Sequence, residues 1–267
     1  MKKILLTAVL AATVSFAIAQ ETQENEVLTN RRGTPILPTA GTWALGVDAT
    51  PFLNFAGNIF GASATAPSFN GATFFGKYFL RDNKALVFRV NINSWSGSTV
   101  NFVDKAGTTT GEIVENVSRS TNTFVRLHFG CERRIGSGRL QGFYGAEAVL
   151  GFGSAGNRIS NTWGNDLTSN FQNGGQWRVL VDKPGVNFEI GANAFVGIEY
   201  FVAPGIALGA RVGYGMSFET GGRRSQDQER WHDGRRETRT QEDFTRTNAN
   251  VFRFNNFGGG ITLTFHF

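Results

Sequence analysis

Histidine, serine and acidic side chains are the groups in this sequence best suited to nucleophilic or acid–base chemistry. The chain has three histidines: His128, His232 and His266. A histidine joined to a serine and an acid would support lipid hydrolysis or acyl transfer. His128 lies in an alternating apolar/polar segment, His232 in a highly charged stretch, and His266 next to the last residue. We expect the three at different levels of the fold, and therefore no shared catalytic site.

Two further motifs have residue types that occur in cofactor or metal sites. Residues 151–156 match the G-x-G-x-x-G pattern, whose glycines open a helix after a strand in dinucleotide-binding folds. The segment that follows, NRISNTWGNDL, has the composition of a loop instead. His128 and Cys131 are three positions apart, which places them on opposite faces of a strand. We therefore predict no bound dinucleotide, no metal pair and no cofactor.

The start of the chain has the pattern of an export signal. A basic beginning and an apolar run lead to a small-x-small cleavage site at 17–19. This is typical of a secretory signal peptide over 1–19, and the apolar run is shorter than the roughly 20 residues of a membrane-spanning helix. The polar stretch 20–40 is predicted to be a flexible periplasmic arm, and 41–267 to form one domain.

Composition narrows the class of protein further. The 267 residues include 34 glycines and 25 phenylalanines but a single cysteine, so no intramolecular disulfide can form. The net charge of +5 falls to +3 without the two lysines of the export signal, which does not indicate a nucleic-acid partner. Abundant glycine and phenylalanine favour a protein made of many strands.

Strict apolar/polar alternation predicts the elements that position these side chains. The pattern has period two, which indicates β-strands with one apolar and one polar face. Its phase slips near Asn255, where we expect a β-bulge. The alternation predicts eight strands: 41–53, 70–81, 84–96, 121–135, 139–153, 186–202, 206–219 and 249–267.

Short and long connections alternate between the predicted strands. The short ones are tight turns at Asp82-Asn83, at 136–138 and at 203–205. The long ones span 54–69, 97–120, 154–185 and 220–248. Long loops without secondary structure count against a compact soluble domain, whereas outer-membrane barrels combine short periplasmic turns with long extracellular loops. We therefore expect an all-β, eight-stranded antiparallel up-and-down transmembrane β-barrel.

Charged residues recur on the polar faces of five strands. A soluble barrel would turn this face to water and its apolar set inward. However, an eight-stranded interior is only just filled by side chains, and the apolar set here is rich in large aromatics. We therefore expect the apolar set to face lipid and the charges to lie inside, where Arg89, Arg126 and Arg211 pair with Glu147, Glu189 and Glu199 in an order that depends on strand register. The predicted network comprises Arg89, Arg126, Arg211, Glu132, Glu147, Glu189 and Glu199.

The last eight residues, GITLTFHF, end the chain on an alternating strand. Ile261, Leu263, Phe265 and Phe267 form its apolar face. In this pattern the chain resembles small bacterial outer-membrane barrels of the OmpA/OmpX-like group. The resemblance implies that these four residues are the signal that the outer-membrane assembly machinery reads. It also implies residence in the outer membrane of a Gram-negative bacterium.

The segment 220–248 contains seven arginines and six acids. It is interpreted first as a solvated, mobile loop. The alternative is a contact surface in which Arg230, Trp231, Arg235 and Arg236 bind lipopolysaccharide phosphates or a protein partner. The sequence thus predicts a non-enzymatic barrel with a structural or interaction role, considered also as a subunit of a larger complex. A lipid-modifying barrel enzyme and a small channel are the alternatives.

Overall fold

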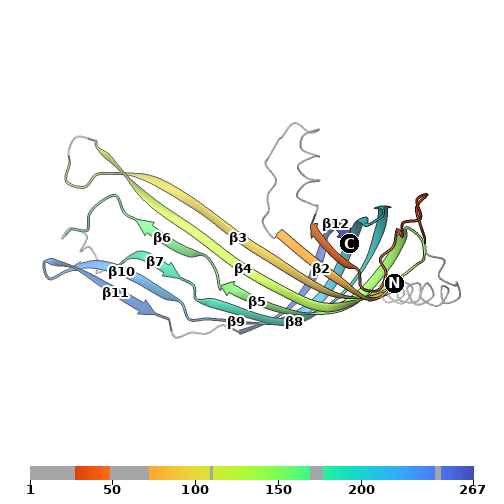
Figure 1. Ribbon diagram of the computed structural model, residues 1–267. Coiled ribbons are helices and arrows are strands. Elements are labelled where there is room, and N and C mark those ends of the chain that lie inside the picture. Colours follow the sequence, from red (N-terminus) through yellow and green to blue (C-terminus); the bar gives the residue numbers. More distant parts are fainter. Residues whose placement is uncertain (1–27, 49–71, 109–110, 169–176, 244–247) are drawn as a thin grey trace, which may run out of the picture.

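A computed structural model describes residues 28–48, 72–108, 111–168, 177–243 and 248–267. These residues form a sheet of twelve antiparallel strands (Figure 1). Among them no helix is long and apolar enough to cross a membrane. Eight strands make a barrel: β1 (Trp43–Asp48), β2 (Ala72–Arg81), β3 (Lys84–Asp104), β4 (Ile113–Ile135), β5 (Leu140–Ser154), β8 (Val186–Ala203), β9 (Ile206–Gly221) and β12 (Asn248–His266). Four more strands lie outside the barrel: β6 (Arg158–Thr162), β7 (Arg178–Lys183), β10 (Ser225–His232) and β11 (Arg235–Glu242).

The barrel closes through pairings between consecutive barrel strands. Each of the eight pairs antiparallel with the next along the chain, and β1 pairs with β12 to complete the ring. The prediction of a closed, eight-stranded antiparallel up-and-down barrel is thereby confirmed. The predicted bulge is also present, because the β12–β9 register shifts between Asn255 and Gly260.

Three tight turns gather at one end of the barrel, which we call the turn end. β2 and β3 are joined by residues 82–83, and β8 and β9 by Pro204-Gly205. Gly205 has φ +73°, a backbone conformation that a residue with a side chain rarely adopts. The β4–β5 turn uses Gly136 in the same way, with φ +113°. These glycines let the strands reverse in few residues and keep neighbouring strands in register.

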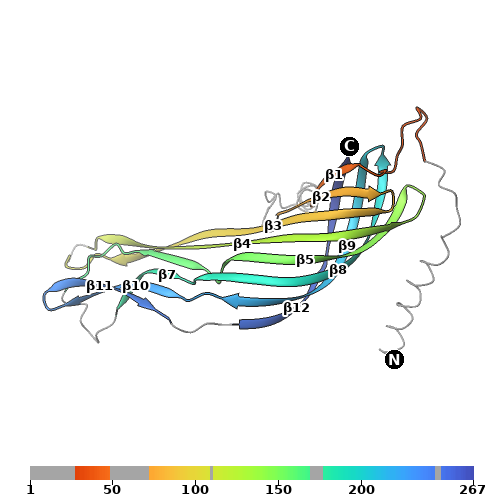
Figure 2. The ribbon, with the colours of Figure 1, turned by 60° about the horizontal axis from the view of Figure 1, so that its bottom comes forward.

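The connections at the other end correct the sequence prediction. Residues 97–120, expected to be a loop, mostly continue the β3–β4 hairpin, and 154–185 contains β6 and β7. Residues 220–248, interpreted as a mobile loop, contain the β10–β11 hairpin with a turn at Asp233-Gly234. The six strands join edge to edge in the order β11-β10-β7-β6-β4-β3. We call this sheet beyond the barrel the extension; it gives the molecule its elongated shape (Figures 1 and 2).

The barrel carries apolar side chains outside and charged side chains inside. On β8, Ile190 is 60% exposed, whereas the neighbouring Glu189 is 6% exposed. On β12, Phe265 is 46% exposed and Thr264 is fully buried. The two faces alternate residue by residue, as period two requires. This distribution is the reverse of that in a water-soluble globular domain.

Residues 28–40, which belong to the segment expected to be a flexible arm, pack against the barrel. Ile36 is only 3% exposed and packs on Phe201 and Ala207, with Leu28 and Leu37 partly buried around it. Thr29 and Pro35 form an isolated bridge that tightens this segment. The apolar residues between the prolines were too few to stand out in the sequence. The segment covers the turn end of the barrel; the earlier part of the predicted arm and the signal peptide lie outside the described residues.

Beneath this segment the turn end is filled by apolar side chains. Ala44, Phe79 and Ala85 are fully buried and pack together, and Phe201 and Ala207 are fully buried beside them. With Ile36 above them, these groups leave the barrel interior packed with side chains at this end.

Candidate functional site

The barrel interior contains three groups of charged residues at successive levels. The group nearest the turn end, here the lower cluster, joins Lys77 of β2, Glu132 and Arg134 of β4, and Glu199 of β8. Lys77 Nζ lies 3.1 Å from Glu132 and 3.5 Å from Glu199, and Arg134 Nε lies 3.2 Å from Glu132. Arg134 also pairs with Glu199. All four side chains are at most 5% exposed, so two cations and two anions balance in a dry site.

The middle cluster is built around Glu147 of β5, whose side chain is fully buried. Arg89 of β3 pairs with Oε1 of Glu147, and Arg211 of β9 lies 2.8 Å from Oε2. His128 Nδ1 is 2.9 Å from Oε1, and Asn193 Nδ2 donates to the same oxygen over 2.8 Å. The carboxylate of Glu147 therefore contacts four side chains, each from a different strand.

The third group, the upper pair, lies farther from the turn end. Arg126 Nε of β4 donates to Glu189 of β8 over 2.7 Å. The guanidinium of Arg126 also lies 4.6 Å from the ring centre of Phe124. This pair is balanced, one cation to one anion.

The predicted arginines all lie inside the barrel, and their partners are two of the three expected glutamates, Glu147 and Glu189. Arg89 and Arg211 share Glu147, whereas Glu199 is held by Lys77 and Arg134. The sequence analysis did not single out these last two residues. Lys77 alternates with outward-facing neighbours on β2, and Arg134 continues the even-numbered inward series of β4. The alternation of inward and outward positions along each strand is enough to predict that both side chains point into the barrel.

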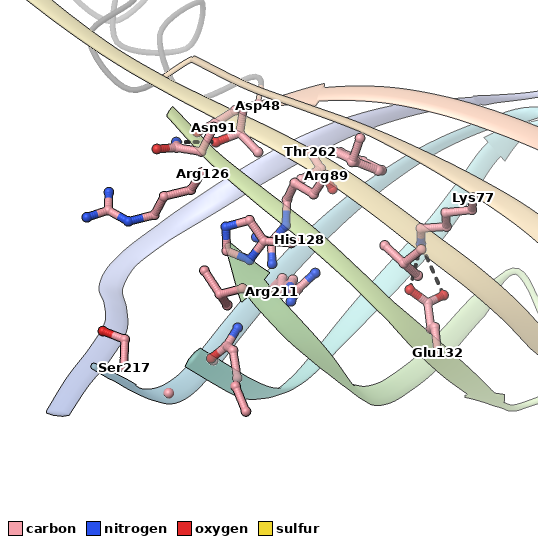
Figure 3. A pocket seen from close by; sticks show the side chains of 18 of the residues that line it. Asp48, Lys77, Arg89, Asn91, Arg126, His128, Glu132, Arg211, Ser217 and Thr262 are labelled. Atoms are coloured by element: carbon pink, nitrogen blue, oxygen red, sulfur yellow. Dashed lines mark hydrogen bonds and ion pairs between the residues drawn. The ribbon is translucent and has the colours of Figure 1, made fainter. Parts of the chain in front are cut away.

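A cavity of about 210 Å³ lies within the barrel beside these groups. Figure 3 shows Arg89, His128 and Arg211 close together at its wall, with Lys77 and Glu132 to one side. Asn91, Asn193 and Thr262 add neutral polar groups to the lining. The cavity is therefore rich in hydrogen-bond donors.

The three histidines lie at different levels, as expected. His128 is in the middle cluster and His232 is near the tip of the β10–β11 hairpin. His266 lies near the turn end, where its ring centre is 5.2 Å from that of Phe201 and 5.7 Å from that of Phe79. Within the described part of the chain no group of three metal-ligating side chains occurs.

The four residues of the predicted assembly signal lie on the seam that closes the barrel. Ile261, Phe265 and Phe267 are exposed on the outer face, and Leu263 shares their parity on β12. Phe267 and Trp43 exchange two backbone hydrogen bonds, of 2.9 and 3.0 Å. The final residue therefore takes part in the last strand pairing.

The four predicted contact residues of segment 220–248 lie near the turn of the β10–β11 hairpin, two on each strand. Arg230 pairs with Glu237 at 3.0 Å, and its guanidinium lies 4.5 Å from the ring centre of Trp177. Arg236 lies 3.6 Å from Glu229 and opposite Trp231 across the hairpin, while Arg235 lies opposite His232. Ion pairs and cross-strand contacts thus help to hold this hairpin in the extension.

Ion pairs also connect β7 to β10. Arg224 donates to Asp182 through two nitrogens, with Nε to Oδ1 at 2.8 Å, and Gln226 adds a third hydrogen bond. Hydrogen bonding by Arg224 holds the pKa of Asp182 below its ordinary value. Lys183 lies 2.8 Å from Asp227, and its hydrogen bond lowers the pKa of that carboxyl.

No family model matches the sequence, and no curated protein matches it.

Proposed function

We propose that the protein is a non-enzymatic outer-membrane β-barrel whose outer face contacts lipid and whose extension binds a protein partner outside the cell. The observation that carries the first part is the distribution of side chains: large apolar groups cover the outside of a closed barrel that has charged groups inside. A closed barrel satisfies all its backbone hydrogen bonds internally, so its apolar face is suited to lipid. Export through the signal peptide and insertion by the outer-membrane assembly machinery are part of this proposal.

The dimensions of the apolar face support a membrane location. On β5 the outward apolar residues run from Leu140 to Phe152. Thirteen strand residues tilted by about 45° span about 28 Å along the barrel axis, close to the roughly 30 Å of a hydrocarbon core. Near the turn end, the rings of Trp43 and Tyr78 pack against each other in a tilted arrangement, with ring centres 4.6 Å apart. Such aromatics are typical of the interfacial girdles of outer-membrane barrels.

The packed interior favours an interaction role over the channel alternative. The turn end is filled by Phe79 and Phe201 and covered by Ile36. The lower cluster occupies the level above with fully paired charges. An eight-stranded barrel filled in this way holds its strands together rather than conducting solutes.

The extension supports a role in binding a partner. Phe102 and Ile113 lie near the tip of the β3–β4 hairpin and are 67% and 64% exposed, respectively. Beyond Ile92, no described strand pairs with the free side of β3. Exposed aromatic residues and unpaired strand edges are both surfaces on which proteins bind. Outer-membrane lipopolysaccharide is a further proposed contact, through the arginines of the β10–β11 hairpin.

Protease treatment of intact cells tests the location and the orientation. The proposal places both termini and the three tight turns in the periplasm and the extension outside. Added protease should cut within 97–120, 154–185 or 220–248 and spare the turn at 82–83. Cleavage at 82–83 in intact cells, or recovery of the protein in the soluble fraction, would contradict the proposal.

Site-specific crosslinking tests the interaction role. A photo-reactive phenylalanine derivative at position 102 should give a discrete protein adduct in living cells. The matched control carries the same group at Leu150, on the barrel's outer face, and should not give that adduct. Identical adducts, or none, at both positions would contradict a partner-binding extension.

A further inference from the structure

We propose that the barrel cavity binds a small oxyanion between Arg89 and Arg211. The proposal starts from the uneven distribution of charge in the middle cluster. Two guanidinium groups face one carboxylate, Glu147, and both arginine side chains are mostly buried, with 17% and 15% exposure. Two cations held together away from water are favourable only when anionic groups balance them.

The other interior groups have no such imbalance. The lower cluster holds two cations and two carboxylates, and Arg126 has Glu189 to itself. Their carboxylates are therefore engaged with other cations. The remaining acid that lines the cavity, Asp48, lies beside Asn91 and away from Arg211 (Figure 3). Positive charge is thus concentrated where the two arginines meet.

Hydrogen-bond capacity points to the same position. Oε1 of Glu147 already receives Arg89, His128 and Asn193. Arg211 Nη2 lies 2.8 Å from Oε2 of Glu147, whereas Arg89 Nε is buried and has no hydrogen-bond acceptor among the described residues. A guanidinium carries five N–H donors in a planar fork that suits carboxylate and phosphate oxygens. An oxyanion beside these two side chains would supply an acceptor for Arg89 Nε and a second negative charge for the two guanidinium groups.

The size of the cavity limits the ligand. At about 210 Å³ it is smaller than the roughly 300–1,000 Å³ of pockets for drug-sized molecules. Phosphate, sulfate and short carboxylates are therefore the class that fits. Because the turn end is filled by apolar side chains, the anion would enter from the end that carries the extension.

Binding can be measured on the folded, detergent-purified protein. Thermal unfolding should be followed in phosphate, sulfate, acetate and chloride at one constant ionic strength. We expect phosphate or sulfate to raise the midpoint above that in chloride, and acetate to show whether a carboxylate suffices. Calorimetric titration with phosphate should give one site per chain. Equal midpoints in all four salts, or no bound phosphate, would overturn the proposal.

Three variants locate the site. Arg211→Gln should weaken phosphate binding at least tenfold, whereas Arg236→Gln, which alters an arginine on the extension, should leave it unchanged. Glu147→Gln removes the competing carboxylate and should strengthen phosphate binding. If Arg211→Gln does not fold, the refolding yield of Glu147→Gln is measured in phosphate and in chloride. A higher yield in phosphate than in chloride supports the site. An equal yield in the two salts refutes it.

Discussion

Glu199→Gln is the substitution that most sharply tests the lower cluster. Glu199 is 1% exposed and holds both Lys77 and Arg134. Its loss leaves these two cations facing Glu132 alone. An uncompensated buried charge costs about 3–5 kcal/mol. Since Glu132 stays within 3.2 Å of both cations, we expect the free energy of unfolding to fall by about 3 kcal/mol, the lower end of this range.

A double-mutant cycle separates charge balance from other effects of the substitution. Adding Arg134→Met to Glu199→Gln restores one cation, Lys77, to one anion, Glu132. The loss of unfolding free energy in the double variant should therefore be smaller than the summed losses of the two single variants. The expected difference is about 1–3 kcal/mol. The control is Glu112→Gln, which breaks the half-exposed pair with Lys105 and should cost roughly 0.2–1 kcal/mol.

The assay is urea unfolding in lipid vesicles, followed by the fluorescence of the five tryptophans. Two results together would refute the reasoning. The first is that Glu199→Gln lowers the free energy of unfolding no more than Glu112→Gln does. The second is that the effects of Glu199→Gln and Arg134→Met simply add in the double variant. Such a result would mean that the lower cluster is hydrated and that its charges act independently.

Three further outcomes follow from the structure. Arg224 holds the pKa of Asp182 below its ordinary value of 3.8, so this pair stabilises the extension above that pH, and its contribution is lost as the pH falls through the lowered pKa. Tryptophan fluorescence should therefore report a change below pH 3.8 that Asp182→Asn lacks. Identical profiles for the two proteins would count against this prediction. Gly145→Val should destabilise the barrel by about 1–3 kcal/mol, because a side chain there would overlap the β4 backbone. The control is Gly138→Ala, because the added methyl group would enter open space. An equal electrophoretic shift on heating for the two variants would contradict the prediction. Deletion of Phe267 should lower the amount of membrane-inserted protein in a pulse-chase experiment, because the closing seam loses two backbone hydrogen bonds; unchanged insertion would show that this residue is dispensable.

The barrel strands were predictable because each carries one continuous apolar face. On β8 and β9 that face runs almost the whole length of the strand, and period two is unambiguous. The bulge in β12 was likewise visible as a change of phase. These features are local, so the sequence alone reports them.

The extension was not predictable in the same way, because its strands carry polar residues on both faces and lack one continuous apolar face. Beyond Ile92, for example, β3 continues with serines at 94, 96 and 98, and the apolar alternation fades while the strand does not. One signal was available: Asp233-Gly234 between two segments of strand length is typical of a tight hairpin. The charges that flank it concealed the hairpin within an apparent loop.

The sequence could predict which charged side chains point into the barrel, but not which of them form ion pairs with one another. Parity placed Arg89, Arg126 and Arg211 on the inward side, yet their partners depend on strand register and barrel tilt, which are set by the whole ring. The closure of the turn end by Ile36 is another long-range contact. Its neighbour Phe201 lies 165 positions farther along the chain, and no local pattern in the sequence relates the two residues.

The central claim, that lipid covers the outer face, can be tested at Cys131, the single cysteine. Cys131 is exposed on β4, two positions from the outward-facing Phe129. A nitroxide attached there, in protein reconstituted into vesicles, should be relaxed strongly by oxygen and weakly by a water-soluble nickel chelate. The control nitroxide, at Thr99→Cys on the extension in a Cys131→Ser background, should show the opposite preference. Strong relaxation of the Cys131 label by the nickel chelate would contradict the account.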